Sequence, residues 1–350
     1  MVVGRGILAR AQAELARELG GRRCVVISDS RVARLHGAGF AAGLVARGAR
    51  ASLLTFPPGE RSKTRETKAR LEDDLHRLGA DRHSVIVALG GGVTGDLAGF
   101  VASTWHRGIP VVQVPTTLLA MLDAAIGGKT AVDLPGGKNL VGAFHQPVAL
   151  WAYVRVLETL PDRAFRAGLA EAVKLGAACD AALFRGIERD AALLARRQER
   201  AVERLVARCL AAKGRIVRAD PFDAGPRQAL NFGHTVAHAI EVATDFNVPH
   251  GEAVAIGIAI EAAAAMRVTG LPEADARRMI ALLEAVGLPV RAPRGLDGAL
   301  LRDAMGRDKK RREGATRCAL PRRLGRMRRT GDPTVPVDAA RDLLPLLLRN

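Results

Sequence analysis

Cysteine is scarce in this 350-residue chain, and the four that occur lie far apart. Cys24, Cys179, Cys209 and Cys318 form no CxxC pair. This spacing excludes a disulfide framework and a metal site built from cysteine pairs. It indicates reduced thiols, so we expect a cytoplasmic protein.

Long apolar runs are also missing. The first twenty residues, "MVVGRGILARAQAELARELG", contain no apolar stretch of the length that a signal peptide needs. The segment "AVAIGIAIEAAAAM" is interrupted by Glu261 and is too short to span a bilayer. We therefore expect no membrane partner, and we expect this segment to form a buried helix.

Acidic residues are too few to balance the basic ones, and the net charge is +17. Residues 307–329 hold eleven lysines and arginines against two acids, so this segment supplies +9 of the total. Aromatic residues, which would stack on nucleic-acid bases, make up 3% of the chain and do not occur in this segment. We expect a solvated basic surface that partly faces a small phosphorylated, carboxylated substrate, and no nucleic-acid partner.

The order of the apolar segments predicts two domains, at 1–156 and 157–350. In the first, short β-branched runs alternate with helical patterns, which predicts a Rossmann-like α/β domain with a mostly parallel sheet. The runs lie at 22–28, 51–56, 84–90 and 109–115, and the first helical patterns at 41–48 and 64–79. In the second, long Ala/Leu/Arg/Glu segments predict a largely helical domain. These segments lie at 161–216, 228–243, 251–268 and 272–287.

A glycine cluster follows the third predicted strand, in "SVIVALGGGVTGDLAGF". Gly90, Gly92 and Gly95 have the G-x-G-x-x-G spacing that lets the backbone approach a pyrophosphate at a helix N-terminus. The dinucleotide fingerprint normally opens the first βα unit and has an acid about twenty residues later, but residues 110–116 contain no acid. The pattern favours a phosphate-binding turn in a non-standard nucleotide fold, with a plain tight turn as the alternative.

Two lysines next to glycine pairs follow in "PTTLLAMLDAAIGGKTAVDLPGGKNLVGAFHQP". Lys129 and Lys138 can bring a compact cation close to an anion pocket that is lined by backbone N–H groups. The segment also contains two threonines, an aspartate and an asparagine. This composition predicts a binding site for an anionic ligand.

Histidines and acids in the second half indicate a metal site. His234, His238 and Glu241 share a helix face, and His250 stands just before another predicted helix. Glu171 lies with Lys174 on a predominantly apolar helix, where charges are rarely buried without a partner or a metal. Two imidazoles and a carboxylate are a common catalytic zinc set. The residues alone leave open whether His234, His238 or both are ligands.

Several long motifs together resemble the 3-dehydroquinate synthase family, and the resemblance covers nearly the whole chain. They are, in chain order, "GGGVTGDLAGF", the lysine segment quoted above, "LAEAVKLG", "LNFGHTVAHAIE", "HGEAVAIG" and "RDKK". The resemblance implies an NAD-binding α/β domain, a helical metal-binding domain with zinc or cobalt, and a homodimer. It implies a lyase of the shikimate pathway of aromatic amino acid biosynthesis. The family converts 3-deoxy-D-arabino-heptulosonate 7-phosphate to 3-dehydroquinate by transient oxidation with NAD, phosphate elimination, reduction and intramolecular aldol closure.

The matching motifs also imply roles for individual residues. The implied metal ligands are Glu171, His234 and His250, which leaves His238 as a substrate-side or proton-relay residue. The implied NAD site comprises Asp29, Gly59, Glu60, Lys63, Gly92, Val93, Thr94, Gly95, Asp96, Thr116, Thr117, Lys129, Lys138 and Thr159. The implied substrate site comprises Asp123, Lys129, Lys138, Asn139, Lys174, Lys213, Arg227, and Lys309 or Lys310, with Arg107 as a phosphate contact that the partner subunit can supply.

Other functions fit parts of the pattern. Another sugar phosphate cyclase would act on sedoheptulose 7-phosphate or on an amino analogue of the usual substrate, and Arg227 with the "DKK" lysines favours a carboxylate-bearing substrate over sedoheptulose 7-phosphate. A metal-dependent alcohol dehydrogenase of related fold would not need the lysines at 129 and 138. A basic binding protein without enzymatic activity would leave the glutamate and histidines unexplained.

Overall fold

The computed structural model describes residues 1–4, 7–19, 21–135, 137–306, 316–327 and 331–348. The chain divides into two compact units, Met1–Pro161 and Asp162–Asn350. The division falls at the start of the first long helix of the second half.

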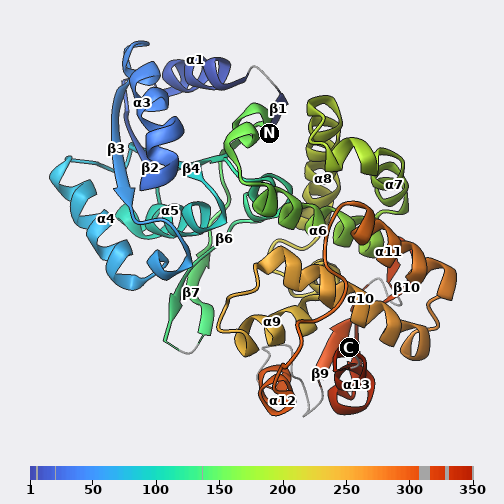
Figure 1. Cartoon of the computed structure of the whole chain (residues 1–350). Helices are drawn as coiled ribbons and strands as arrows, with labels where there is room; N and C mark the ends of the chain where they lie inside the picture. The colour runs from blue at the N-terminus through green and yellow to red at the C-terminus, as the bar shows by residue number, and fades with distance from the viewer. Residues whose placement is uncertain (5–6, 20, 136, 307–315, 328–330, 349–350) are drawn as a thin grey trace. The chain divides into compact units, whose positions relative to one another are not determined.

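A six-stranded parallel sheet forms the centre of the first unit (Figure 1). The strand order is β1-β8-β5-β4-β2-β3. The strands are β1 (Val2–Gly4), β2 (Arg23–Asp29), β3 (Arg50–Phe56), β4 (Val85–Gly90), β5 (Val111–Pro115) and β8 (Ala149–Tyr153). The helices are α1 (Ile7–Leu19), α2 (Ser30–Val32), α3 (Ala38–Val45), α4 (Arg65–Arg77) and α5 (Gly92–Thr104). The predicted Rossmann-like domain with its parallel sheet is confirmed.

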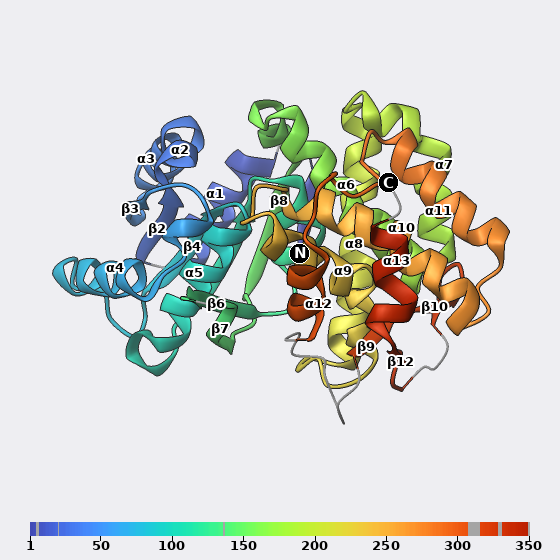
Figure 2. The same ribbon diagram turned by 60° about the horizontal axis from the view of Figure 1, so that its bottom comes forward.

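Both faces of this sheet are buried, which explains why its strands are apolar without interruption. Val25 and Ile27 of β2 contribute to one core together with residues of α4 and α5. Cys24 and Val26 alternate with them and contribute to the other core, with residues of α1 and α3. The two layers of helices lie on opposite sides of the strands (Figure 2). Alternation along one strand therefore fills two separate cores.

The strand order reverses between β2 and β4. From β2 the chain runs outward to β3, then returns to β4 beside β2 and continues through β5 towards β8. Crossing helices lie on opposite faces at such a switch point, so the carboxyl ends of the two strands border an open crevice where ligands bind in this class of fold. Asp29 ends β2 and Gly90 ends β4. The fold thus brings two predicted cofactor segments to one edge of the sheet.

An antiparallel hairpin that the strand pattern does not predict completes the first unit. It consists of β6 (Lys129–Leu134) and β7 (Gly137–Phe144), and it packs on α5. Gly142 permits this pairing, because a Cβ there would lie 1.9 Å from the backbone oxygen of Thr130. The lysine segment therefore forms a β-ribbon.

The second unit is mostly helical, as predicted. Its helices are α6 (Asp162–Cys179), α7 (Ala181–Ala195), α8 (Glu199–Ala219), α9 (His234–Ala243), α10 (His250–Val268), α11 (Glu273–Ala285), α12 (Gly298–Gly306) and α13 (Leu344–Leu347). The described part also contains two small antiparallel pairs that the sequence analysis does not predict. These are β9 (Thr316–Ala319) with β12 (Thr334–Val337), and β10 (Pro321–Arg323) with β11 (Arg326–Met327). None of the helices described here has both the length and the apolar character that crossing a bilayer requires.

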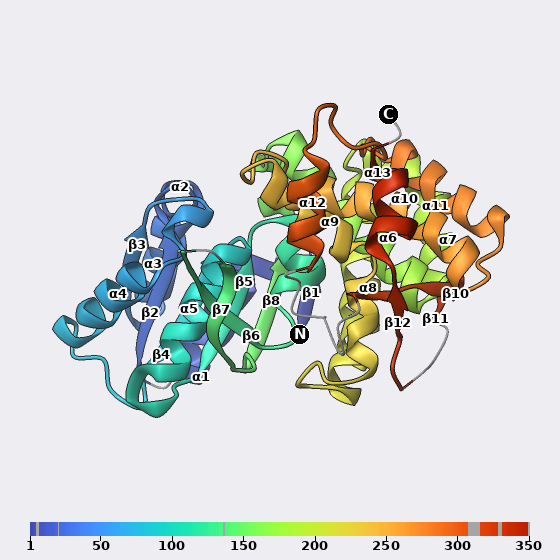
Figure 3. The ribbon, with the colours of Figure 1, turned by 90° about the horizontal axis from the view of Figure 1, so that it is seen from below.

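Helix α10 lies at the centre of this unit and contacts both α6 and α9 (Figure 3). Gly251 faces α6 so closely that a Cβ would lie 1.9 Å from the Ala167 backbone oxygen. Gly257 faces the start of α9, where a Cβ would lie 2.0 Å from the Gly233 backbone oxygen. The backbones of α6 and of the start of α9 therefore contact α10 directly, and only glycine leaves room for this approach.

Replacing Gly257 with alanine is expected to destabilise the protein. The methyl group would push α9 away from α10, and overpacking of this kind costs about 1–3 kcal/mol or more. Urea denaturation measures the loss as a lower free energy of unfolding. Gly39→Ala in α3 is the matched control, because its Cβ would meet no atom within 4 Å and alanine favours a helix by about 0.5–1 kcal/mol. Equal stability of the Gly257→Ala variant and the unsubstituted protein would contradict the described packing.

Candidate active site

Glu171 is a buried carboxylate of the second unit, in the middle of α6. Only 3% of the residue is exposed, and Lys174, one turn later and equally buried, forms an ion pair with Oε2. Neither carboxylate oxygen accepts a hydrogen bond of ordinary geometry from the described residues. Burial alone would raise the pKa of Glu171, but Lys174 and His250 lower it to about 2. The site thus holds a buried negative charge that Lys174 and His250 stabilise.

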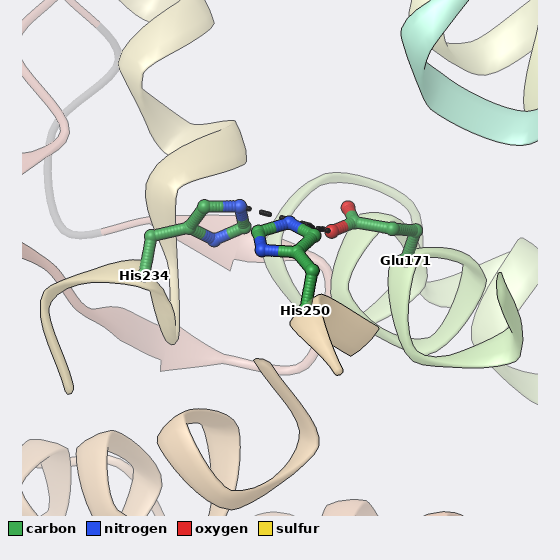
Figure 4. Close-up of side chains that lie close together, drawn as sticks. All are labelled: Glu171, His234 and His250. Atoms are coloured by element: carbon green, nitrogen blue, oxygen red, sulfur yellow. Dashed lines mark ion pairs between the residues drawn. The ribbon is translucent and has the colours of Figure 1, made fainter. Parts of the chain in front are cut away.

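Two histidines converge on this carboxylate (Figure 4). His234 is the first residue of α9 and His250 is the first residue of α10. The Nε2 atom of His234 lies 3.7 Å from Glu171 Oε1, and that of His250 lies 3.5 Å from the same oxygen. Three segments that are far apart in sequence therefore present one ligand atom each to a common point.

The three side chains fit a divalent metal ion. Their potential ligand atoms all lie within 4.8 Å of one another. Ligand atoms placed about 2.1 Å from a tetrahedral zinc ion would be roughly 3.4 Å apart, close to the two distances given above. A carboxylate with two imidazoles also leaves coordination positions open for substrate or water, as in catalytic zinc sites.

The other ring nitrogen of each histidine has its own neighbour. His250 Nδ1 lies 3.3 Å from Glu241 Oε1, and His234 Nδ1 lies 3.3 Å from the backbone oxygen of Phe232. Such partners fix the tautomer and ring orientation of a metal-binding histidine. Burial would lower the pKa of His250, but Glu171 and Glu241 raise it to about 10. A proton therefore occupies His250 when no cation balances the two carboxylates.

His238 lies beside this group and outside the set of three. Its ring is exposed, one turn after His234 on α9, with centroids 5.5 Å from His234 and 6.5 Å from His250. Its role as a substrate-side or relay residue stays a prediction.

Two buried acids of this unit have partners that the sequence analysis did not assign. Glu241 shares a helix face with His234 and His238, but its carboxylate contacts His250 on another helix. Glu261 interrupts an apolar run, and its carboxylate accepts hydrogen bonds from the start of α9. In both cases the sequence signal that indicated a buried partner was a charged residue within an apolar helix.

Further buried cations of the second unit are Lys213 on α8 and Arg227, which follows the end of α8. Arg227 is positioned by Asp220, whose Oδ2 accepts its backbone N–H at 3.1 Å, and its Nη1 donates to the Pro221 oxygen. Burial would raise the pKa of Asp220, but hydrogen bonds from backbone N–H groups hold it below its usual value. These cations suit a ligand with several negative charges.

The glycine turn of the first unit lies at the N-terminus of α5. Gly91 caps the helix, and a Cβ at Gly90 would lie 2.3 Å from Thr94 Oγ1, so residue 90 has no room for a side chain. Thr116, whose N–H donates to Gly90, has a buried Oγ1 without a hydrogen-bond partner among the described residues. Bare backbone at a helix N-terminus beside an unsatisfied hydroxyl fits a phosphate of a nucleotide.

Lys63 joins three segments of the first unit. Its Nζ lies 2.5 Å from Asp96 Oδ2 on α5 and 2.5 Å from Asn139 Oδ1 on β7, and 4.0 Å from Glu60. Burial would lower the pKa of Lys63, but Asp96 and Glu60 raise it above its usual value. Burial raises the pKa of Asp96 to about 6, although Lys63 opposes this shift. Glu60 also lies 3.9 Å from Lys138, so the structure brings together residues predicted at 60, 63, 96, 138 and 139.

The remaining predicted residues have separate places. Asp29 caps the short helix α2, and Thr159 contacts His36 just after it. An open pocket of about 560 Å³ lies at the carboxyl ends of β2 and β3 and does not include the glycine turn. Six other predicted residues lie in turns or at element ends: Gly59, Val93, Thr117, Asp123, Lys129 and Arg107. Lys309 and Lys310 lie outside the described residues.

Comparison with known proteins gives matches over most of the chain. The family model for the 3-dehydroquinate synthase N-terminal region matches residues 53–167, and the model for the C-terminal region matches residues 168–311. A 3-dehydroquinate synthase of Pelobacter propionicus is 46% identical over 312 residues, which are 89% of this chain and 86% of that protein.

Solved structures of two synthases are similar over nearly their whole length. The 2-epi-5-epi-valiolone synthase of Streptomyces hygroscopicus, with NAD+ and Zn2+ bound, has a TM-score of 0.88 at 31% identity, covering 99% of this chain and 95% of that one. A 2-deoxy-scyllo-inosose synthase, complexed with carbaglucose-6-phosphate, NAD+ and Co2+, has a TM-score of 0.88 at 30% identity, covering 98% and 94%.

The raised pKa of Asp96 predicts a pH dependence of stability. The folded state holds this proton more tightly than the unfolded chain, so the Asp96 contribution to stability decreases as the pH rises from 3.8 to about 6. Urea denaturation of the unsubstituted protein and of Asp96→Asn across this range measures it as a falling difference in the free energy of unfolding. Glu14→Gln, in an exposed pair with Arg10, should show no such slope. A constant difference for Asp96→Asn would contradict the shift.

Glu241→Gln is expected to weaken divalent-metal binding, because His250 would lose the carboxylate that orients its ring. Changes to such partners typically lower metal affinity about 10–100-fold. Competition with a chromophoric chelator measures the zinc affinity of the metal-free protein. Glu284→Gln, an exposed acid on α11, is the control and should bind zinc normally. Unchanged affinity in Glu241→Gln would show that the contact does not support a metal ligand.

Proposed function

The chain belongs to the 3-dehydroquinate synthase family, and we propose that it converts 3-deoxy-D-arabino-heptulosonate 7-phosphate to 3-dehydroquinate and phosphate. The observation that carries this proposal is the convergence of Glu171, His234 and His250 on one point next to the buried cation Lys174. A metal set with an adjacent cation suits a substrate that presents both hydroxyl oxygens and anionic groups.

We propose that these three residues hold one divalent ion and that the first unit holds NAD. The turn Gly92–Asp96 would face the pyrophosphate, with Thr116 and Thr117 beside it and Glu60 and Lys63 near by. When bound, the ion polarises substrate oxygens and NAD acts as a reversible oxidant. The use of zinc or cobalt by similar cyclases supports an ion of this class.

The chain's own residues would then bind and orient the substrate. Lys174, Lys213 and Arg227 are buried cations of the second unit and would pair with its carboxylate and phosphate groups. The resemblance also assigns Lys129 and Lys138 to substrate binding. His238 is exposed beside the metal set and would hold or move a proton on a substrate oxygen. Holding the acyclic intermediate in one orientation favours ring closure. The resemblance further predicts a cytoplasmic homodimer with Arg107 near the phosphate.

The test is turnover by the purified protein with the heptulosonate phosphate, catalytic NAD and a divalent metal. We expect equimolar phosphate and dehydroquinate without net NADH. Net NADH would instead identify an alcohol dehydrogenase. Turnover only of sedoheptulose 7-phosphate or of the amino analogue would identify another cyclase.

Glu171→Gln is expected to abolish this activity, because the neutral amide is a poor metal ligand next to Lys174. A loss of about 10²–10³-fold or more, the scale on which key electrostatic groups act, would agree with the assignment. Glu188→Gln, which alters an exposed pair with Arg278, is the control and should remain active. Full activity of Glu171→Gln would contradict the ligand role.

A further inference from the structure

Glu261 is a charged residue in a fully apolar setting. It lies in the second half of α10, in the run "AIEAAAA", and none of its surface is exposed. Burying an ionised carboxylate costs several kcal/mol unless hydrogen bonds replace the lost water. Its presence there therefore requires strong local partners.

Those partners are the first N–H groups of α9. Glu261 Oε2 accepts from Gly233 N at 2.7 Å, and Oε1 accepts from Thr235 N at 3.0 Å and from Val236 N at 3.2 Å. These groups would otherwise lack partners at the start of a helix. The negative charge also interacts favourably with the positive end of the helix dipole. Glu261 thus caps α9 from a different helix.

The sequence at the start of α9 cannot supply this cap locally. The N-cap residue is Gly233, which has no side chain and adopts a left-handed conformation at φ 82°. A Cβ at Gly233 would lie 2.8 Å from Ile258 Cγ1 and 3.1 Å from the Val254 oxygen on α10. The two helices meet so closely here that a capping side chain on α9 would not fit, whereas Glu261 reaches the same N–H groups from α10.

His234 stands between the residues that Glu261 holds. Its neighbours Gly233 and Thr235 both donate to the carboxylate, so the Cα position and direction of His234 are fixed relative to α10. His250 is the first residue of that same helix. Glu261 therefore sets the position of one histidine relative to the other.

We propose that Glu261 is a positioning residue that holds His234 in register with His250 for metal binding, an inference that rests on the metal site of the proposed function. It acts through the backbone of α9 and touches neither the metal nor the substrate. Its removal should loosen His234 while the side chains of all three ligands remain present.

The test measures zinc affinity and the visible absorption of the cobalt-loaded protein for Glu261→Gln and Glu261→Met. Gln keeps the shape but brings an NH2 group towards the backbone donors, and Met fills a similar volume without burying a polar group. We expect zinc affinity to fall about 10–100-fold in both, as for other residues that support metal ligands. The cobalt bands should change in intensity or position because the coordination geometry changes.

Asp342→Asn is the matched control. Asp342 is a buried carboxylate of the same unit that accepts a backbone N–H, from Asp338, and it contacts Arg267 at the other end of α10. The Asp342→Asn substitution should lower thermal stability and leave zinc affinity and cobalt absorption unchanged. A similar loss of affinity in this variant would show a general effect of destabilisation and would overturn the positioning role.

The outcomes separate this inference from the proposed function. If the unsubstituted protein binds no divalent metal, the proposed metal site itself is wrong. If it binds zinc and both Glu261 variants bind zinc equally well with unchanged cobalt spectra, only the positioning role is wrong. Failure of both variants to fold while Asp342→Asn folds would assign Glu261 to the stability of the whole unit and would also overturn it.

Discussion

The backbone contact of α10 with α6 and α9 is the constraint on which the candidate metal site depends. Glycines at 251 and 257 let the helices approach until side chains are excluded. Each helix carries one member of the Glu171–His234–His250 set, so the positions of the ligands follow from the helix crossings. The chemistry of the site is thus a product of helix packing, with polar contacts from Glu241 and Glu261 adjusting the histidines.

The first unit uses a different principle, in which the topology of the sheet collects the polar groups. The reversal of strand order leaves the carboxyl ends of β2 and β4 side by side. The glycine turn at the start of α5 then exposes backbone N–H groups where no side chain competes. The ammonium group of Lys63 contacts both α5 and the β6–β7 hairpin and so holds these two elements together.

The sequence alone predicted the features that depend on local patterns. Continuous β-branched runs predicted four of the six parallel strands, β2 to β5, and missed the short strands β1 and β8. The long motifs predicted the family. The hairpin at β6 and β7 was missed because each strand has a lysine next to glycines at its start and neither strand shows a clear period of two. The partner of Glu261 could not be predicted, because a hydrogen bond from the Gly233 N–H to the Glu261 carboxylate depends on how two helices cross. The same holds for the contact between Lys63 and Asn139.

The ligands at 171, 234 and 250 come from three helices of one unit. No short peptide segment of the chain contains the full set, so a cation can be captured only after these helices have assembled. A bound ion would then link these three helices to one another. Local opening between α9 and α10 would release it even while the parallel sheet stays folded, because that sheet contributes none of the three ligands.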